Sequence, residues 1–154
     1  SFNGFNLIDK KDHIDNYIEI CHNNKHTISN LDYKSITNGS STSILFAKAI
    51  ITKHSSDSQA YQKNNNLMLS PKSTIHSNPQ LEIYNNDVQC SHGSTTGALD
   101  EDQIFYMRTR GVSKEDAKKL LISGFLNETI DRIDFSNIKN HFFKKIDSYL
   151  LNVN

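Results

Sequence analysis

The chain has 154 residues with 17 basic and 17 acidic side chains, so its formal net charge at pH 7 is zero. This length suits one domain or two small ones, and the balanced charge excludes a strong attraction to nucleic acid or anionic lipid. The sequence has no apolar run of bilayer length and no signal-peptide pattern at Ser1. Two cysteines are too few for a disulfide framework, which favours the cytoplasm or an equivalent organelle stroma or matrix.

Composition changes near residue 98. The first 98 residues hold eight basic and eight acidic side chains, both prolines and four of the six glycines, whereas the last 56 residues hold nine basic and nine acidic ones. This change predicts turn-rich β structure over residues 1–98 and exposed helices over residues 99–154. The opening Ser1-Phe2-Asn3-Gly4-Phe5 is typical of the middle of a strand region, so we expect a fragment or a processed chain.

Short strands are predicted through the first part. They cover residues 5–8, 14–21, 27–36, 44–52, 66–69, 74–76, 80–84 and 88–90. The strand from Ile44 is apolar on both faces, which predicts cover on both sides. Asn38-Gly39-Ser40-Ser41 and Asn64-Asn65-Asn66 are predicted turns, because Asn and Gly tolerate a left-handed backbone.

Leu69, Ile75 and Leu81 recur every six residues, and Pro71 and Pro79 lie between them. This spacing indicates coils of a β-solenoid, in which each turn buries its apolar residues on the turn before. Three positions do not establish a repeat, so a β-sandwich stays open as the alternative.

Three amphipathic helices are predicted in the second part. Asp100-Glu101-Asp102 begins the first and Gly111 ends it; Ser113 caps the second; and the third starts at Asp134 or Ser136. The second helix has an apolar stripe at helical spacing, made of Ala117, Leu120, Leu121, Gly124, Phe125 and Ile133. The stripe of the third is Ile138, Phe142, Ile146, Tyr149 and Leu150. Either stripe serves ordinary packing or docks a partner.

The candidate site is the pair Cys90 and His92. In an extended strand, residues two apart point to the same face, and a thiolate with an imidazole is a soft donor pair for metal. The alternative is a half-buried cysteine beside a surface histidine. Cys21, His22 and His26 form a second possible donor cluster, but no paired Cys-x-x-Cys supports a structural zinc site. Gly93-Ser94-Thr95-Thr96-Gly97 lacks the lysine of a phosphate-binding loop, so we interpret it as a turn.

Longer motifs resemble a known family. They are the runs 65–70, 75–84 and 87–97, with Cys90-Ser91-His92-Gly93 at their centre, followed by Leu99 to Val112 and the helix from Ala117 to Ile133. Together these runs resemble the SufB/SufD family, and the Cys-Ser-His-Gly form resembles its SufD branch. The resemblance implies a mainly β fold, a right-handed parallel β-helix (solenoid) over residues 1–98, followed by a C-terminal α-helical domain over residues 99–154.

The resemblance also implies a function. Members of this family are scaffold subunits without turnover of their own that help to build nascent iron–sulfur clusters with a SufB subunit and the ATPase SufC. His92 matches the histidine at the junction with SufB, and Cys90 lies beside it, so both are candidate ligands of a transient cluster shared with that partner. The helices imply a SufC contact, for which we single out the basic residues Arg108, Arg110, Lys114, Lys118 and Lys119. Whether a flavin touches the chain stays open.

Two other functions compete with this one. A free-standing structural protein, such as a SufD homodimer, fits the same sequence. A solenoid enzyme acting on carbohydrate needs clustered carboxylates, yet Glu19 and Glu82 are the only glutamates before residue 101. A hexapeptide-type acyltransferase needs a long six-residue repeat, which only Leu69, Ile75 and Leu81 suggest.

Overall fold

A computed structural model describes residues 1–151 and divides the chain into two compact units, Ser1–Thr96 and Gly97–Asn154. The seven strands are β1 (Phe2–Ile8), β2 (His13–His22), β3 (Ile28–Thr37), β4 (Thr42–Ile51), β5 (Ser58–Met68), β6 (Thr74–Ile83) and β7 (Val88–Ala98). The helices are α1 (Glu101–Thr109), α2 (Lys114–Ile130) and α3 (Ser136–Leu150). The last three residues of the predicted helical domain, 152–154, lie outside the described part.

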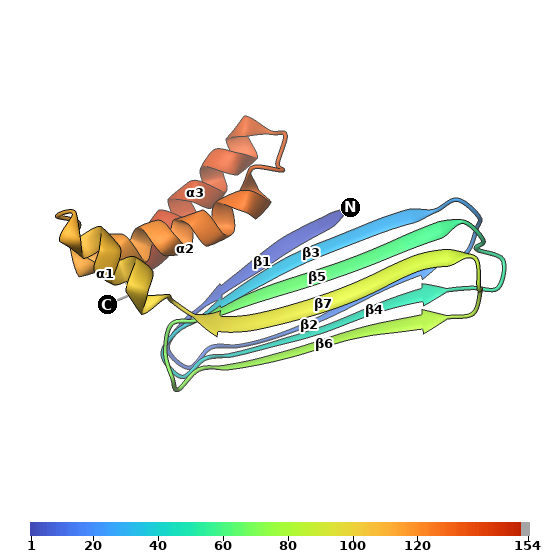
Figure 1. Ribbon diagram of the computed structural model, residues 1–154, viewed down its shortest axis with the longest axis horizontal. Coiled ribbons are helices and arrows are strands. Elements are labelled where there is room, and N and C mark those ends of the chain that lie inside the picture. The colour runs from blue at the N-terminus through green and yellow to red at the C-terminus, as the bar shows by residue number, and fades with distance from the viewer. Residues whose placement is uncertain (152–154) are drawn as a thin grey trace. The chain divides into compact units, whose positions relative to one another are not determined.

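The strands form two parallel sheets that face each other. One sheet has the order β1-β3-β5-β7 and the other β2-β4-β6, because the chain crosses from one to the other after each strand (Figure 1). Phe2 pairs with Leu31 and Thr42 pairs with Thr74, so one coil takes between 29 and 32 residues. The first unit is therefore a parallel β-solenoid of about three turns, as predicted, and the sandwich alternative is wrong.

The six-residue spacing that led to this prediction is not the solenoid repeat. Ile75 and Leu81 lie in the same strand, β6, and Leu69 follows directly after β5 in the same coil. Strands of ten or eleven residues contain several apolar positions each, so a short spacing within one strand resembles a repeat between coils.

The interior has an apolar part and, toward the ends of β1, β3 and β5, a polar part, while His22, Ser55 and Ser58 are buried polar residues at the opposite end. The apolar part consists of Leu31, Tyr33, Leu45, Ala47, Ala49, Ile51 and Ala60. In the polar part, Tyr33 Oη donates to Asn6 Oδ1 (2.8 Å), Asn64 Nδ2 donates to the backbone oxygen of Tyr33 (3.0 Å), and Asn66 Nδ2 donates to Asn64 Oδ1 (2.7 Å). The first two bonds join successive coils and the third lies within β5, which contains both Asn64 and Asn66, so the turn predicted for them is wrong.

Two other strands differ from the prediction. β6 runs unbroken through Pro79, which an edge strand tolerates because one side of its backbone needs no ladder donor. β7 continues through Gly93 to Ala98, so the turn predicted between Gly93 and Gly97 is a strand. In β4, the inward row from Ser43 to Ile51 is buried, whereas the outward Ile44, Phe46, Lys48 and Ile50 are only half-buried. The prediction that both faces of this strand are covered is therefore correct for the inner face, and the outer face is only half-covered.

Gly39 lies where the turns of adjacent coils stack. Its φ is +63°, and a Cβ atom there would lie 2.8 Å from the backbone nitrogen and oxygen of Lys10 in the turn of the preceding coil. Ser40 N donates to Lys10 O at this contact, at 2.6 Å. The predicted turn at Asn38–Ser41 is thus confirmed, and it requires glycine for both its dihedral angles and its spacing.

The helical unit begins with two capped helices. The Asp100 side chain accepts from the backbone nitrogens of Asp102 and Gln103, and Ser113 Oγ accepts from Asp116 N, as predicted. α2 buries Ala117, Ile122, Leu126, Thr129 and Ile130, whereas Leu120 of the predicted stripe is 57% exposed. In α3 the buried residues are Ile146 and Leu150, and Ile138 is exposed. No helix within residues 1–151 is both long and apolar enough to span a bilayer.

We expect Gly39→Ala to lower the free energy of unfolding by about 1–3 kcal/mol, because alanine must take a left-handed conformation and displace the backbone of Lys10. Gly93→Ala is the matched control, since a Cβ atom there meets nothing within 4 Å, and it should change stability by less than about 0.5 kcal/mol. Urea unfolding measures both variants, and equal losses would contradict this account of the turn.

Candidate functional site

The solenoid ends in an open coil. β7 and β6 are the last strands of their sheets, and neither has a neighbour on its outer side among residues 1–151 (Figure 1). After β7 the chain continues into α1, so no strand of the same coil follows β7 in the opposite sheet, and β7 meets β6 of the preceding coil across the interior. We call the inward residues of β7 the open face; they are Val88, Cys90, His92, Ser94 and Thr96.

Three contacts show that these residues point inward. Ser94 Oγ donates to Ser77 Oγ of β6 in the opposite sheet, at 2.8 Å. Val88 and Cys90 pack against the buried cluster of Ala49, Ile51 and Ala60. Side chains alternate along a strand, so His92 lies on the same face, between Cys90 and Ser94.

His92 is exposed although its side chain lies on the inner face. Because β7 belongs to the last coil of the described solenoid, no further coil covers the ring. Within residues 1–151 it has no hydrogen-bond partner, so both ring nitrogens are available to an external group. An imidazole in this state can bind a metal through one nitrogen and a hydrogen-bond acceptor through the other.

Cys90 is more deeply buried than His92. It is half-buried beside Leu81 and Val88, and this burial raises the pKa of its thiol, while a hydrogen bond with the Ala60 backbone lowers the pKa to a smaller extent. Metal binding requires the thiolate. The structure therefore brings the predicted pair to one face, with the His92 imidazole exposed and the Cys90 thiol half-buried in an apolar environment.

The second predicted donor cluster does not form. Cys21 is exposed, whereas His22 is buried with its ring nitrogens bonded to Thr27 Oγ1 (2.6 Å) and Ser29 Oγ (2.7 Å). His26 Nδ1 pairs with Asp57 Oδ2 at 2.7 Å. Across residues 1–151, no three His, Cys, Asp or Glu side chains gather where they could hold a metal ion.

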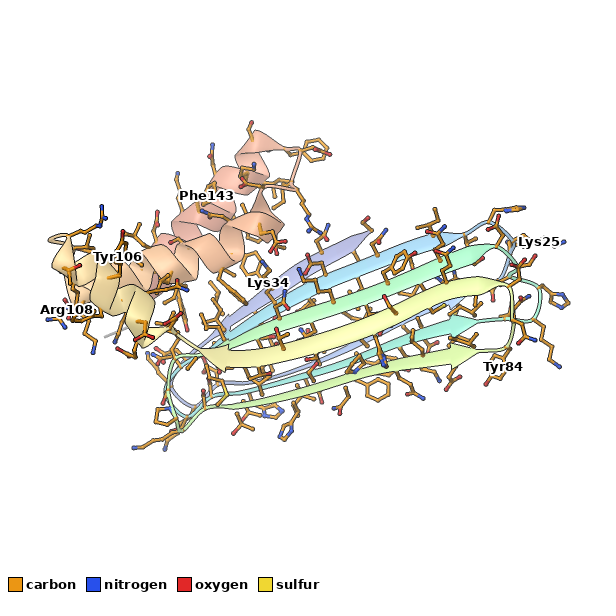
Figure 2. All side chains as sticks on the ribbon, in the orientation of Figure 1. Lys25, Lys34, Tyr84, Tyr106, Arg108 and Phe143 are labelled. Atoms are coloured by element: carbon orange, nitrogen blue, oxygen red, sulfur yellow. The ribbon has the colours of Figure 1, made fainter. Side chains whose placement is uncertain are left out.

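The basic residues predicted to contact a partner do not form one cluster on the helical unit. Arg108 and Lys114 line one hollow at the turn between α1 and α2 (Figure 2 shows Arg108 on α1). Arg110 lies over the Tyr106 ring, 4.7 Å from its centroid. Lys118 is half-buried, and Lys119 lines a different groove, between α2 and α3.

Sequence reasoning missed the apolar part of that groove. Leu120 and Leu151, which are 57% and 73% exposed, line it together with Leu150 and Asp147. Leu120 falls on the apolar stripe of the sequence, where helical periodicity predicts burial. The position of α3 against α2 decides which leucines are covered, and periodicity contains no signal for it.

The fold and the open face define a class of protein, a parallel β-solenoid that ends in an accessible inner strand and continues into helices. Comparison with known families identifies the class. The SufBD core domain of the SUF system for FeS cluster assembly matches residues 1–125, so the chain belongs to this family.

Individual relatives agree with this family. The chain is 31% identical over 118 residues to the iron–sulfur cluster assembly protein SufD of Escherichia coli, covering 77% of this chain and 28% of that protein. It is 34% identical over 125 residues to an iron–sulfur cluster assembly SufBD family protein of Synechocystis, covering 81% and 28%. A chloroplastic protein of Arabidopsis thaliana, ABCI7, is 31% identical over 105 residues, covering 68% and 22%. The chain thus spans roughly a quarter of the length of these curated relatives.

We expect iodoacetamide to alkylate Cys90 more slowly than Cys21, because the Cys90 thiol is half-buried against the apolar cluster of Ala49, Ile51 and Ala60 whereas Cys21 is exposed. Burial raises the pKa of both thiols, so exposure decides the difference in rate. Peptide mass spectrometry over time measures both sites in one sample, and the urea-unfolded chain is the control in which the two rates converge. Equal rates in the folded protein would show that Cys90 is accessible.

Proposed function

We propose that this chain is a SufD-type scaffold subunit without turnover of its own, which pairs with a SufB-type subunit to form the site where a nascent iron–sulfur cluster is assembled. The observation that carries the proposal is the exposed His92 on the inner face of an open last coil. Membership of the SufBD family and the names of its relatives support the process.

The open coil supports pairing with another solenoid. The outer edges of β6 and β7 present backbone N–H and C=O groups that no strand of the described chain pairs. Such edges add strands from a partner. A SufB-type subunit with the same coil geometry continues both sheets and encloses the open face. A second copy of this chain meets the same edges, and size-exclusion chromatography with and without the SufB-type subunit distinguishes a heterocomplex from a homodimer.

His92 supplies one ligand to the transient cluster, which is the cargo of the complex. A neutral imidazole is an established ligand of iron–sulfur clusters. Because the described residues of this chain gather no group of three donors, a partner supplies the rest of the ligand set. Cys90 is the second candidate ligand, and it requires a rotation away from its apolar neighbours and loss of its thiol proton.

The helical unit is the proposed contact for a SufC-type ATPase. Arg108 and Lys114 in the hollow at the α1–α2 turn provide positive charge, with Arg110 beside them. Lys118 and Lys119 extend the basic surface along α2, and Lys119 borders the groove with Leu120. Basic residues around an apolar contact are typical of an interface rim. Both cysteines are free, which fits the reducing conditions of a cytoplasm or an organelle stroma.

We expect His92→Ala to reduce the iron and sulfide bound by the reconstituted complex by at least about tenfold, since loss of a ligand costs no less than loss of its hydrogen-bond partner. His76→Ala is the matched control, because His76 is also exposed but belongs to the outward row of β6. Iron and acid-labile sulfide are measured per complex, with subunit binding checked by chromatography. Unchanged cluster content in His92→Ala would remove this residue from the assembly site.

We expect Arg108→Glu combined with Lys114→Glu to weaken binding of the ATPase subunit by about tenfold at low salt, because rim charges govern encounter and like charges repel. The difference should shrink as salt rises. The control is Lys10→Glu with Lys72→Glu, which makes the same charge change at exposed turns of the solenoid. Isothermal titration calorimetry measures both variants. Equal affinity for the two would mean that this hollow lies outside the interface.

A further inference from the structure

Gln62 lies beside His92 on the inner face, in the preceding coil. β5 neighbours β7, and Thr95 Oγ1 donates to Asn65 Oδ1 at 2.9 Å while Asp57 N donates to Asp87 O at 2.7 Å. Both contacts join residues thirty positions apart. The same offset places Gln62 of β5 next to His92 of β7. On its other side, Gln62 pairs with Leu31 of β3.

The Gln62 side chain is held inside the last complete coil. It is 6% exposed, and its Nε2 donates across the interior to the backbone oxygen of Gln80 in β6, at 3.5 Å. This contact assigns the NH₂ group to the side of the amide that faces Gln80. Its Oε1 is buried and has no partner among residues 1–151. A buried acceptor without a donor is unfavourable, so such a group calls for an explanation.

Cys90 and Ser94, the other inner neighbours of His92 on β7, have no buried acceptor that lacks a partner. The Ser94 hydroxyl is already bonded to Ser77, at 2.8 Å. Cys90 packs into the apolar cluster with Ala60. Gln62 has an unpartnered acceptor and His92 has ring nitrogens without partners, and the two residues are neighbours across adjacent strands.

We propose that Gln62 is a positioning residue for His92: its Oε1 accepts the N–H of one ring nitrogen and thereby directs the other ring nitrogen toward the cluster. A metal-bound histidine generally donates its second N–H to an acceptor, which fixes the tautomer and the ring orientation. The inference rests on the proposed function of His92 and adds the residue that prepares the imidazole for binding.

The test uses the reconstituted complex with ferrous iron and sulfide, and compares Gln62→Met with Gln62→Glu. Methionine keeps the length of the side chain but removes the acceptor, so cluster content should fall by about tenfold. Glutamate keeps an acceptor oxygen and should restore most of that loss. Gln59→Met, on the same strand with its side chain on the outer face, is the control and should match the unaltered protein.

A spectroscopic measurement separates positioning from a structural role. In the reduced cluster, electron spin-echo spectroscopy reports the quadrupole coupling of the ring nitrogen that does not bind iron, which depends on its hydrogen bond. We expect this coupling to change in Gln62→Met and to return toward the original value in Gln62→Glu. Thermal unfolding of each variant checks the fold, and if Gln62→Met does not fold, Gln62→Leu takes its place.

The outcomes are distinguishable. If His92→Ala abolishes the cluster but Gln62→Met retains full content and an unchanged nitrogen coupling, the inference fails and the proposed function stands. If both Gln62 variants have less cluster but the cluster that remains has an unchanged nitrogen coupling, the role of Gln62 is structural and the inference also fails. If His92→Ala retains the cluster, the proposed function fails, and the inference fails with it.

Discussion

The parallel backbone ladder between successive coils is the interaction on which the structure depends. Each coil of about thirty residues pairs with the one before it, and the two sheets advance together. Each coil of such a solenoid pairs only with its neighbours, so the last strands keep unpaired backbone donors and acceptors wherever the stack ends. In this chain the stop falls after β7, where the sequence turns to helix. The regularity of the fold thus creates the open coil, and the open coil makes the inner face of β7 accessible.

The division of the interior into an apolar and a polar part explains why neighbouring residues have different chemistry. Cys90 and His92 share a face by strand alternation, but Cys90 lies over Ala60 in the apolar part and His92 lies beside Gln62, where the polar part begins. Burial among hydrocarbon raises the pKa of the thiol. Two residues further along β7, the His92 imidazole is exposed and lies next to the Gln62 amide. A displacement of one residue in register would reverse the faces and place Ser91 inside.

Local sequence patterns predicted where strands and helices occur better than where each strand or helix ends. Alternation located most of the strands and capping residues located the starts of α1 and α2, since these signals act within a few residues, whereas the N-cap of α3, Phe135, makes no side-chain capping bond. Asn64 to Asn66 and Gly93 to Gly97 resemble turns locally, yet they form strands because the ladder to the adjacent coil outweighs their weak strand propensity. Leu120 has helical spacing but is exposed, since the packing of α3 on α2 decides which face is covered. The pair Cys90 and His92 followed from spacing, whereas Gln62 did not, because it is thirty residues away in a solenoid whose coils share no visible repeat.

By itself the sequence determined the change from strand to helix near residue 98, the family to which the chain belongs, and the common face of Cys90 and His92. These follow from patterns that are local or from motifs long enough to be specific. Only the tertiary structure decided the length of the coil, the depth at which each inner residue lies, and the unpartnered oxygen of Gln62 next to His92. Those properties arise from contacts between residues about thirty positions apart, and such contacts depend on the register of the strands, which no single stretch of sequence encodes.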